Sequence, residues 1–278
     1  MARSTRTILV IAVVAIVGLG GVFGVRKLWD LAKSHLTSSG CTIASYELDT
    51  SQAAVASTMV GAVSRYSPAL PERAAVLVLA AALQESKLRN LAPGQGDRDS
   101  VGVLQQRPSQ GWGGSDPANR AARLSNVGEA TTEFLDHLVK FGNWQALPLA
   151  QAIQNVQISA DGSAYAQHED EAKTLADALL GSRPAAISCS FETPTKVAPL
   201  AVVARQLRAQ LPVGAPTTQG HTVRVPGAAW QTAAWFVANA DRLGIDEVAY
   251  DGMTWTRAHG WKTAPASKTA VVATLHQV

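Results

Sequence analysis

Residues 74–87 read AAVLVLAAALQESK and are the most informative stretch of the chain. Pro71 suits a first helical position and Glu72 suits the positive end of a helix, so the pattern predicts a helix over residues 71–87. Because this helix is apolar on nearly every face, we expect it to be buried. Glu85 then lies at the end of a buried helix, where loss of hydration disfavours the carboxylate and raises its pKa.

The position of Glu85 supports two interpretations. A carboxyl group that stays protonated near neutral pH is what cleavage of a glycosidic bond needs, because the leaving oxygen must receive a proton. In the other interpretation, Glu85 is a helix-end residue that pairs with Arg89 or Arg98. A Gly- and Pro-rich loop follows at residues 91–117, and loops of this length inside a compact domain are usually functional.

Two short motifs lie at and beyond the end of this helix. Glu85 and Ser86 are followed, after a gap, by the sequence GVLQ at residues 102–105. Together the motifs resemble the Glu-Ser and Gly-Leu-Met-Gln signatures of soluble lytic transglycosylase and goose-type lysozyme domains, and the resemblance covers residues 51–181. A longer pattern, formed by QESKLRN at residues 84–90, GDRDSVGVLQQRPSQGWG at residues 96–113 and AYAQHE at residues 164–169 with a cysteine on either side, also resembles exported, membrane-anchored actinobacterial proteins of the lysozyme-like type.

This resemblance implies a role for each motif residue. Glu85 matches the general acid, and Ser86 matches the hydroxyl group beside it. Gly102 would permit the backbone to approach a sugar closely, and Gln105 offers the sugar both a donor and an acceptor. The two motifs would then form opposite walls of a substrate cleft.

The sequence departs from the family pattern in two places. The sequence GDRD at residues 96–99 lengthens the gap, and either Asp97 or Asp99 could position a water, or Asp97 caps a turn and Asp99 pairs with Arg98. The Ala-Tyr-Asn-Ala-Gly motif of lytic transglycosylases is missing. Tyr165 either corresponds to the tyrosine that hydrogen-bonds the catalytic Glu in that family or is an ordinary half-buried helix tyrosine.

These assignments predict an enzyme that cleaves the bond between N-acetylmuramic acid and N-acetylglucosamine in peptidoglycan, without a cofactor. With no convincing second carboxylate, the 2-acetamido or 6-hydroxyl group of the sugar would complete the reaction, which favours a lytic transglycosylase over a lysozyme. The alternative is a non-catalytic wall-binding or scaffold protein that keeps the lysozyme-like fold, as a component of a secretion or conjugation apparatus.

An uncharged apolar run at residues 8–25 precedes all of these features. It is just long enough to cross a hydrocarbon core of about 30 Å as a helix. A basic head at residues 1–7 precedes it, an amphipathic stem at residues 26–40 follows it, and no A-x-A-like cleavage site comes directly after it. We therefore expect an uncleaved signal anchor rather than a cleaved signal peptide. The expected location is the cytoplasmic membrane, with one span and most of the chain outside the cytoplasm.

The remaining pattern predicts two domains beyond the transmembrane helix, an all-α lysozyme-like domain and a small C-terminal α+β domain. The first covers residues 41–190, with further helices at 118–140, 148–157 and 163–181. After a linker at residues 191–197, the second covers residues 198–278, with helices at 198–210 and 228–243 and strands at 221–225, 247–256 and 270–275.

Cys41 and Cys189 are the only cysteines and flank the predicted helical domain. An even pair beyond an apolar run indicates a disulfide in an oxidising compartment, with two free buried thiols as the other interpretation. The six histidines include no H-x-x-x-H or H-x-H pair, so no metal site is predicted. The net charge is +3 without a Lys/Arg cluster, so nucleic acid is not an expected partner.

Overall fold

Helix α3 (Arg73–Ser86) lies at the centre of the helical part of the fold, as its apolar sequence predicts. The computed structural model describes residues 39–158, 162–227 and 229–277. Ten of the fourteen residues of α3 are buried. The helix packs against helices α2 (Thr50–Arg65), α5 (Val127–Leu138), α6 (Leu149–Gln157) and α7 (Glu169–Leu180). A side chain at the last turn of α3 therefore lies at the edge of the core.

Two of the helices predicted in the first domain are each divided in the structure. The helical pattern at residues 118–140 forms α4 (Arg120–Ser125) and α5, because Asn126 ends the first helix and caps the second. Its side-chain oxygen accepts hydrogen bonds from the backbone N–H groups of Gly128 and Glu129. The pattern at residues 163–181 forms the short 3₁₀ helix η2 (Ser163–His168) and then α7. Another 3₁₀ helix, η1 (Pro108–Gln110), interrupts the long loop.

The prediction of an all-α domain is wrong, because a three-stranded antiparallel sheet closes the helical part. Strand β1 (Gly40–Ile43) lies between β2 (Tyr46–Leu48) and β3 (Ile187–Ser190). These strands are only three or four residues long, so their sequences show no clear alternation. The pairing of β1 with β3 also joins opposite ends of the helical part, which no local pattern could reveal.

The predicted disulfide is confirmed. Cys41 in β1 lies directly opposite Cys189 in β3, and the two sulfur atoms are bonded. The linked residues are 148 positions apart in the sequence. Closing so long a loop stabilises the folded state by up to about 5 kcal/mol in the chain-entropy model.

The C-terminal part is built on a six-stranded antiparallel sheet, with strand order β4-β5-β9-β6-β7-β8. Its strands are β4 (Thr217–Gln219), β5 (Thr222–Pro226), β6 (Ile245–Tyr250), β7 (Met253–Thr256), β8 (Gly260–Thr263) and β9 (Ala270–Leu275). Its helices are α8 (Leu200–Gln210), α9 (Trp230–Ala238) and α10 (Ala240–Leu243). The strand predicted at residues 247–256 is the hairpin β6–β7, whose turn residues Asp251 and Gly252 both have positive φ.

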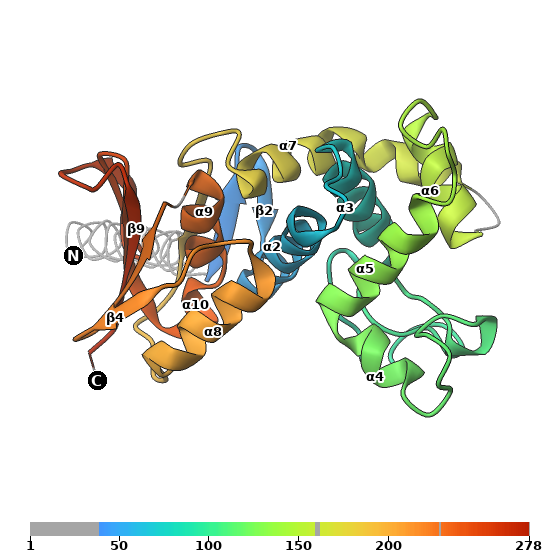
Figure 1. Cartoon of the computed structure of the whole chain (residues 1–278), viewed down its shortest axis with the longest axis horizontal. Coiled ribbons are helices and arrows are strands. Elements are labelled where there is room, and N and C mark those ends of the chain that lie inside the picture. The colour runs from blue at the N-terminus through green and yellow to red at the C-terminus, as the bar shows by residue number, and fades with distance from the viewer. Residues whose placement is uncertain (1–38, 159–161, 228, 278) are drawn as a thin grey trace, which may run out of the picture. The chain divides into compact units, whose positions relative to one another are not determined.

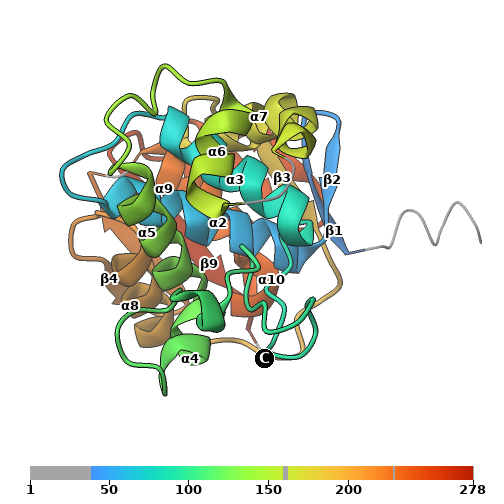
Figure 2. The same ribbon diagram turned by 90° about the vertical axis from the view of Figure 1, so that its right-hand side faces the viewer.

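The helical part and the six-stranded sheet share one hydrophobic core. Helix α9 packs on strands β6 and β9 and also on α2, α7 and β3. In Figure 1 the sheet lies at the left, α8, α9 and α2 occupy the middle, and α4, α5 and α6 lie at the right. Figure 2 views the molecule from the side of α4, α5 and α6. Ser39–Val278 accordingly form one compact unit.

The predicted membrane span at residues 8–25 lies outside the described residues, as do the head and most of the stem. Within residues 39–158, 162–227 and 229–277, no helix combines the length and the apolar character needed to cross a membrane.

Candidate active site

Helix α3 ends immediately after Glu85 and Ser86, where the backbone turns into a left-handed conformation. Lys87 and Leu88 have φ angles of 55° and 58°, so two consecutive residues that are not glycine adopt the left-handed conformation. The Leu88 N–H bonds to the Ala82 carbonyl at 3.1 Å, and its side chain turns back into the core. Such a conformation costs free energy, and residues of this kind cluster at functional sites.

Tyr165 contacts Glu85 directly. Its hydroxyl group donates a hydrogen bond of 2.5 Å to Oε1 of Glu85. Tyr165 is only 1% exposed, so it is not the half-buried helix tyrosine of the simpler interpretation. The short helix η2 brings it to the end of α3, where the tyrosine fixes the direction of the carboxyl group.

Gln157, the last residue of α6, is a contact that the sequence did not reveal. Its side chain hydrogen-bonds with Glu85, and its Nε2 donates to the carbonyl oxygen of Leu104 at 2.8 Å. It therefore joins the carboxyl group to the segment that carries the second motif. A glutamine at a helix end has no distinctive sequence signal, so only the packing of α6 beside α3 reveals this role.

The surroundings of Glu85 favour its protonated form. Burial raises the pKa of Glu85, whereas hydrogen bonding to Tyr165 and Gln157 lowers it, and burial is the larger effect. In the described part of the chain, neither Arg89 nor Arg98 forms an ion pair with Glu85, and Arg98 instead lies near Asp97. The interpretation of Glu85 as an ion-paired helix end is therefore wrong.

The second motif packs against the end of α3 through Ser86. The Ser86 hydroxyl donates to the carbonyl oxygen of Val103 at 2.7 Å, so it ties the two motifs together through the backbone. Gly102 has φ of 79°, and a Cβ atom there would lie 2.1 Å from the carbonyl oxygen of Leu124. Only glycine fits this position. Gln105 folds back on the loop, since its Nε2 donates to the Gly102 carbonyl oxygen at 2.8 Å.

The two aspartates of the insert have contacts of their own in the loop. Asp99 accepts hydrogen bonds from Arg107 Nε at 2.7 Å and from the Ser109 N–H at 2.8 Å. The hydrogen bonds from Ser109 and the contact with Arg107 hold the pKa of Asp99 well below its usual range. Asp99 thus pairs with Arg107 and not with Arg98. The Asp97 side chain is 89% exposed and lies 3.8 Å from Arg98.

A further contact fixes η2 against α3. Oε1 of Gln84 accepts a hydrogen bond from Gln167 Nε2 at 3.1 Å and lies 3.1 Å from His168 Nε2. Burial lowers the pKa of His168, so this imidazole favours its neutral form. Gln167, His168 and Tyr165 all belong to η2, and Gln84 is adjacent to Glu85. The contacts with Gln84 therefore hold η2 where Tyr165 can bond to the carboxyl group of Glu85.

The described part of the chain contains no group of three or more His, Cys, Asp or Glu side chains that could hold a metal ion. No protein-family model matches the chain, and no curated protein matches it. The similarity to lysozyme-like domains thus rests on the two motifs.

Proposed function

We propose that this protein cleaves the glycan strands of peptidoglycan, with Glu85 as the general acid. The observation that carries the proposal is the buried carboxyl group of Glu85, which accepts a hydrogen bond from Tyr165 and has a raised pKa. A raised pKa extends to higher pH the range over which such a group holds a proton that it can deliver to a glycosidic oxygen. The bond from Ser86 to the Val103 carbonyl oxygen, which joins residues 102–105 to the end of α3, supports the proposal that this segment forms the wall of the cleft that the resemblance implies.

In the proposed reaction, Glu85 gives its proton to the glycosidic oxygen as the bond from that oxygen to C1 of N-acetylmuramic acid breaks. The 6-hydroxyl oxygen of the same sugar attacks C1. The proton of that hydroxyl passes to the Glu85 carboxylate, which restores the acid for the next cycle. The products are a 1,6-anhydro sugar end and a free 4-hydroxyl group on N-acetylglucosamine.

The contacts of Asp97 and Asp99 favour this outcome over hydrolysis by an inverting or retaining mechanism. Those mechanisms need a second carboxylate close to the scissile bond. Asp99 is instead bonded to Arg107 and Ser109, and Asp97 is exposed at the surface. An attacking hydroxyl group from the substrate itself needs no second carboxylate.

We also propose that the protein works outside the cytoplasm, anchored through its N-terminal segment. The disulfide between Cys41 and Cys189 supports this location, since such bonds persist in oxidising compartments. The apolar run at residues 8–25 supports the anchor.

Mass spectrometry of purified sacculi incubated with the full-length protein tests the proposal. We expect 1,6-anhydro muropeptides from the wild type and none from Glu85→Gln, which removes the acidic proton but keeps the size of the side chain. Reducing-end products without anhydro ends would show hydrolysis instead. If the protein sediments with sacculi but the wild type releases no more product than Glu85→Gln, the non-catalytic wall-binding alternative is correct.

A further inference from the structure

A cavity of about 880 Å³ lies between α5, the end of α2 and the end of α8. Neither Glu85 nor Tyr165 nor Gln157 lines this cavity, so it is distinct from the proposed catalytic site. Its volume is typical of sites that bind small ligands, which span roughly 300–1,000 Å³. It is therefore a candidate for a second binding site.

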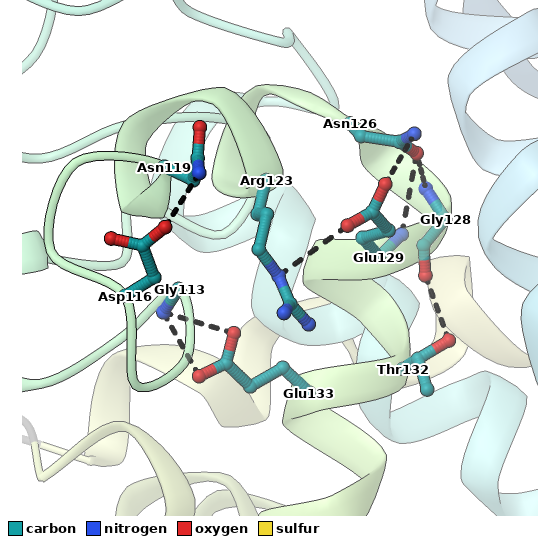
Figure 3. Close-up of polar contacts among 9 residues, drawn as sticks. All are labelled: Gly113, Asp116, Asn119, Arg123, Asn126, Gly128, Glu129, Thr132 and Glu133. Atoms are coloured by element: carbon teal, nitrogen blue, oxygen red, sulfur yellow. Dashed lines mark hydrogen bonds and ion pairs between the residues drawn. The ribbon is translucent and has the colours of Figure 1, made fainter.

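One face of α5 lines this cavity with charged side chains. Glu129, Glu133 and Asp136 follow one another at intervals of three or four residues, which places them on one side of the helix, and Lys140 lies one turn beyond. Figure 3 shows the beginning of this wall, where Arg123 Nε lies 3.4 Å from Glu129 Oε2. Both side chains of that pair are about half exposed. The wall thus presents both signs of charge.

Two of the carboxylates are held in place by uncharged groups. Asp136 accepts a hydrogen bond of 2.8 Å from the hydroxyl group of Tyr66. Both oxygens of Glu133 accept from the backbone N–H of Gly113, at 2.9 and 3.0 Å (Figure 3). Within the described ranges, neither carboxylate takes part in an ion pair. Their positions are therefore fixed while their negative charges stay uncompensated.

Two cations, Arg65 and Lys140, also line this cavity. Arg65 Nη1 donates to the carbonyl oxygens of Arg208 at 3.1 Å and Leu211 at 3.5 Å. Lys140 is exposed. Across the part of the chain that the structure describes, neither cation forms an ion pair. A ligand can therefore pair with them without breaking an existing contact between charges.

We propose that this cavity binds a short peptide that carries both a free ammonium group and a free carboxylate group. The ammonium group pairs with Glu133 or Asp136, and the carboxylate pairs with Arg65 or Lys140. A ligand with one sign of charge would be attracted by one pair and repelled by the other, whereas a zwitterion is attracted by both. Because Glu133, Asp136 and Arg65 are already held by hydrogen bonds, binding loses little of their conformational freedom.

A second cavity extends the site toward the N-terminal end of α2. It has a volume of about 530 Å³ and shares Thr58, Asn126 and Gln210 with the first cavity. Most of its lining residues are uncharged and some, such as Ser51 and Ala54, are small, so it leaves room for the body of a peptide, although Asp241 and Arg242 also line it. The two cavities together form a groove along α2.

Saturation-transfer NMR on the full-length protein in a non-ionic detergent tests this inference, with tri-alanine as the probe. We expect tri-alanine to bind, and N-acetyl-tri-alanine and tri-alanine amide each to bind about two- to fivefold more weakly, as for the loss of one partly exposed ion pair. Equal binding of all three peptides would overturn the proposal. If N-acetylglucosamine trimers bind here and tri-alanine does not, the groove is a carbohydrate site and the proposal is wrong.

Variants place the binding in the groove. Asp136→Asn and Lys140→Gln should each weaken tri-alanine binding about two- to fivefold. Asp170→Asn and Lys262→Gln remove exposed charges that do not line the groove, so they should leave binding unchanged. If the two control variants lost as much affinity as the two groove variants, the binding site would not be this groove. Glu85→Gln should bind tri-alanine as the wild type does. Peptide binding and glycan cleavage are therefore tested separately, and either proposal can fail while the other holds.

Discussion

Glu85 and Asp99 are both carboxylates beside the same motif, yet their surroundings are opposite. Glu85 lies at the end of a buried helix, where burial raises its pKa. Asp99 lies in the loop, where hydrogen bonds from Ser109 and the contact with Arg107 lower its pKa. One residue therefore tends to hold a proton, and the other tends to stay charged.

This difference shows how environment assigns roles to chemically similar groups. A protonated carboxyl group with a fixed direction can act as an acid. A carboxylate that already accepts hydrogen bonds from Arg107 and the Ser109 backbone is committed to holding the loop in shape. The same sequence segment suggested both residues as parts of the site, and only their contacts separate them.

The largest expected effect is on the rate of glycan cleavage. Glu85→Gln should reduce the rate by a factor of about a thousand or more, because it removes the general acid. Asp99→Asn keeps the acid and should reduce the rate by a smaller factor, through loosening of the loop. Release of soluble muropeptides measures both rates. Equal losses in the two variants would show that the contrast between these carboxylates has no catalytic meaning.

Tyr165→Phe tests the difference between the two carboxylates from the side of Glu85, by changing the pKa of that residue. Its hydrogen bond lowers the pKa of Glu85, so its removal should raise that pKa further. The alkaline limb of the pH–rate profile, where the acid loses its proton, should then move to higher pH. We expect the maximal rate to fall about tenfold as the carboxyl group loses its fixed direction. Tyr46→Phe, in strand β2, is the matched control. A limb that stays in place or moves to lower pH would contradict this role.

The two carboxylates should also affect stability in opposite directions. Burial makes the charged form of Glu85 unfavourable, so the wild type loses stability as the pH rises from 4.5, the ordinary pKa, through the raised pKa of the folded state. Glu85→Gln should therefore raise the melting temperature at neutral pH, with a gain that fades below pH 4.5. Circular dichroism melts across pH 3–8 measure this difference.

The contribution of Asp99 to stability depends on pH in the opposite direction, because its pKa in the folded state is depressed. Its contribution is present above pH 3.8, the ordinary pKa, and is lost as the pH falls through the folded-state pKa. Asp99→Asn should therefore lower the melting temperature at neutral pH, and this loss should shrink in acid. If Glu85→Gln and Asp99→Asn shifted the melting temperature in the same direction at pH 7, the two carboxylates would not affect stability in opposite directions.

The smallest effect is expected at Asp97. Its side chain is 89% exposed and lies 3.8 Å from a side chain that is itself 70% exposed. Exposed pairs of this kind contribute about 0–1 kcal/mol. Asp97→Asn should leave both the melting temperature and the cleavage rate unchanged. A large loss of cleavage would instead identify Asp97 as the residue that positions a water.

The sequence by itself determined the features that depend on neighbouring residues. The apolar run of α3 indicates a buried helix, because a helix that is apolar on most faces has nowhere else to lie. Glu85 then falls at its end, where the next residues leave the helical conformation. The spacing of two cysteines around the helical part also indicated the disulfide, although it did not reveal the strands that carry it.

Only the tertiary structure decided which distant segments meet. The sheet that makes the all-α prediction wrong pairs strands from the two ends of the helical part. The contacts of Tyr165 and Gln157 with Glu85 likewise need η2 and α6 to pack against α3. The physical reason is that local patterns reflect the conformational preferences of adjacent residues, whereas these contacts depend on how helices and strands pack across one shared core.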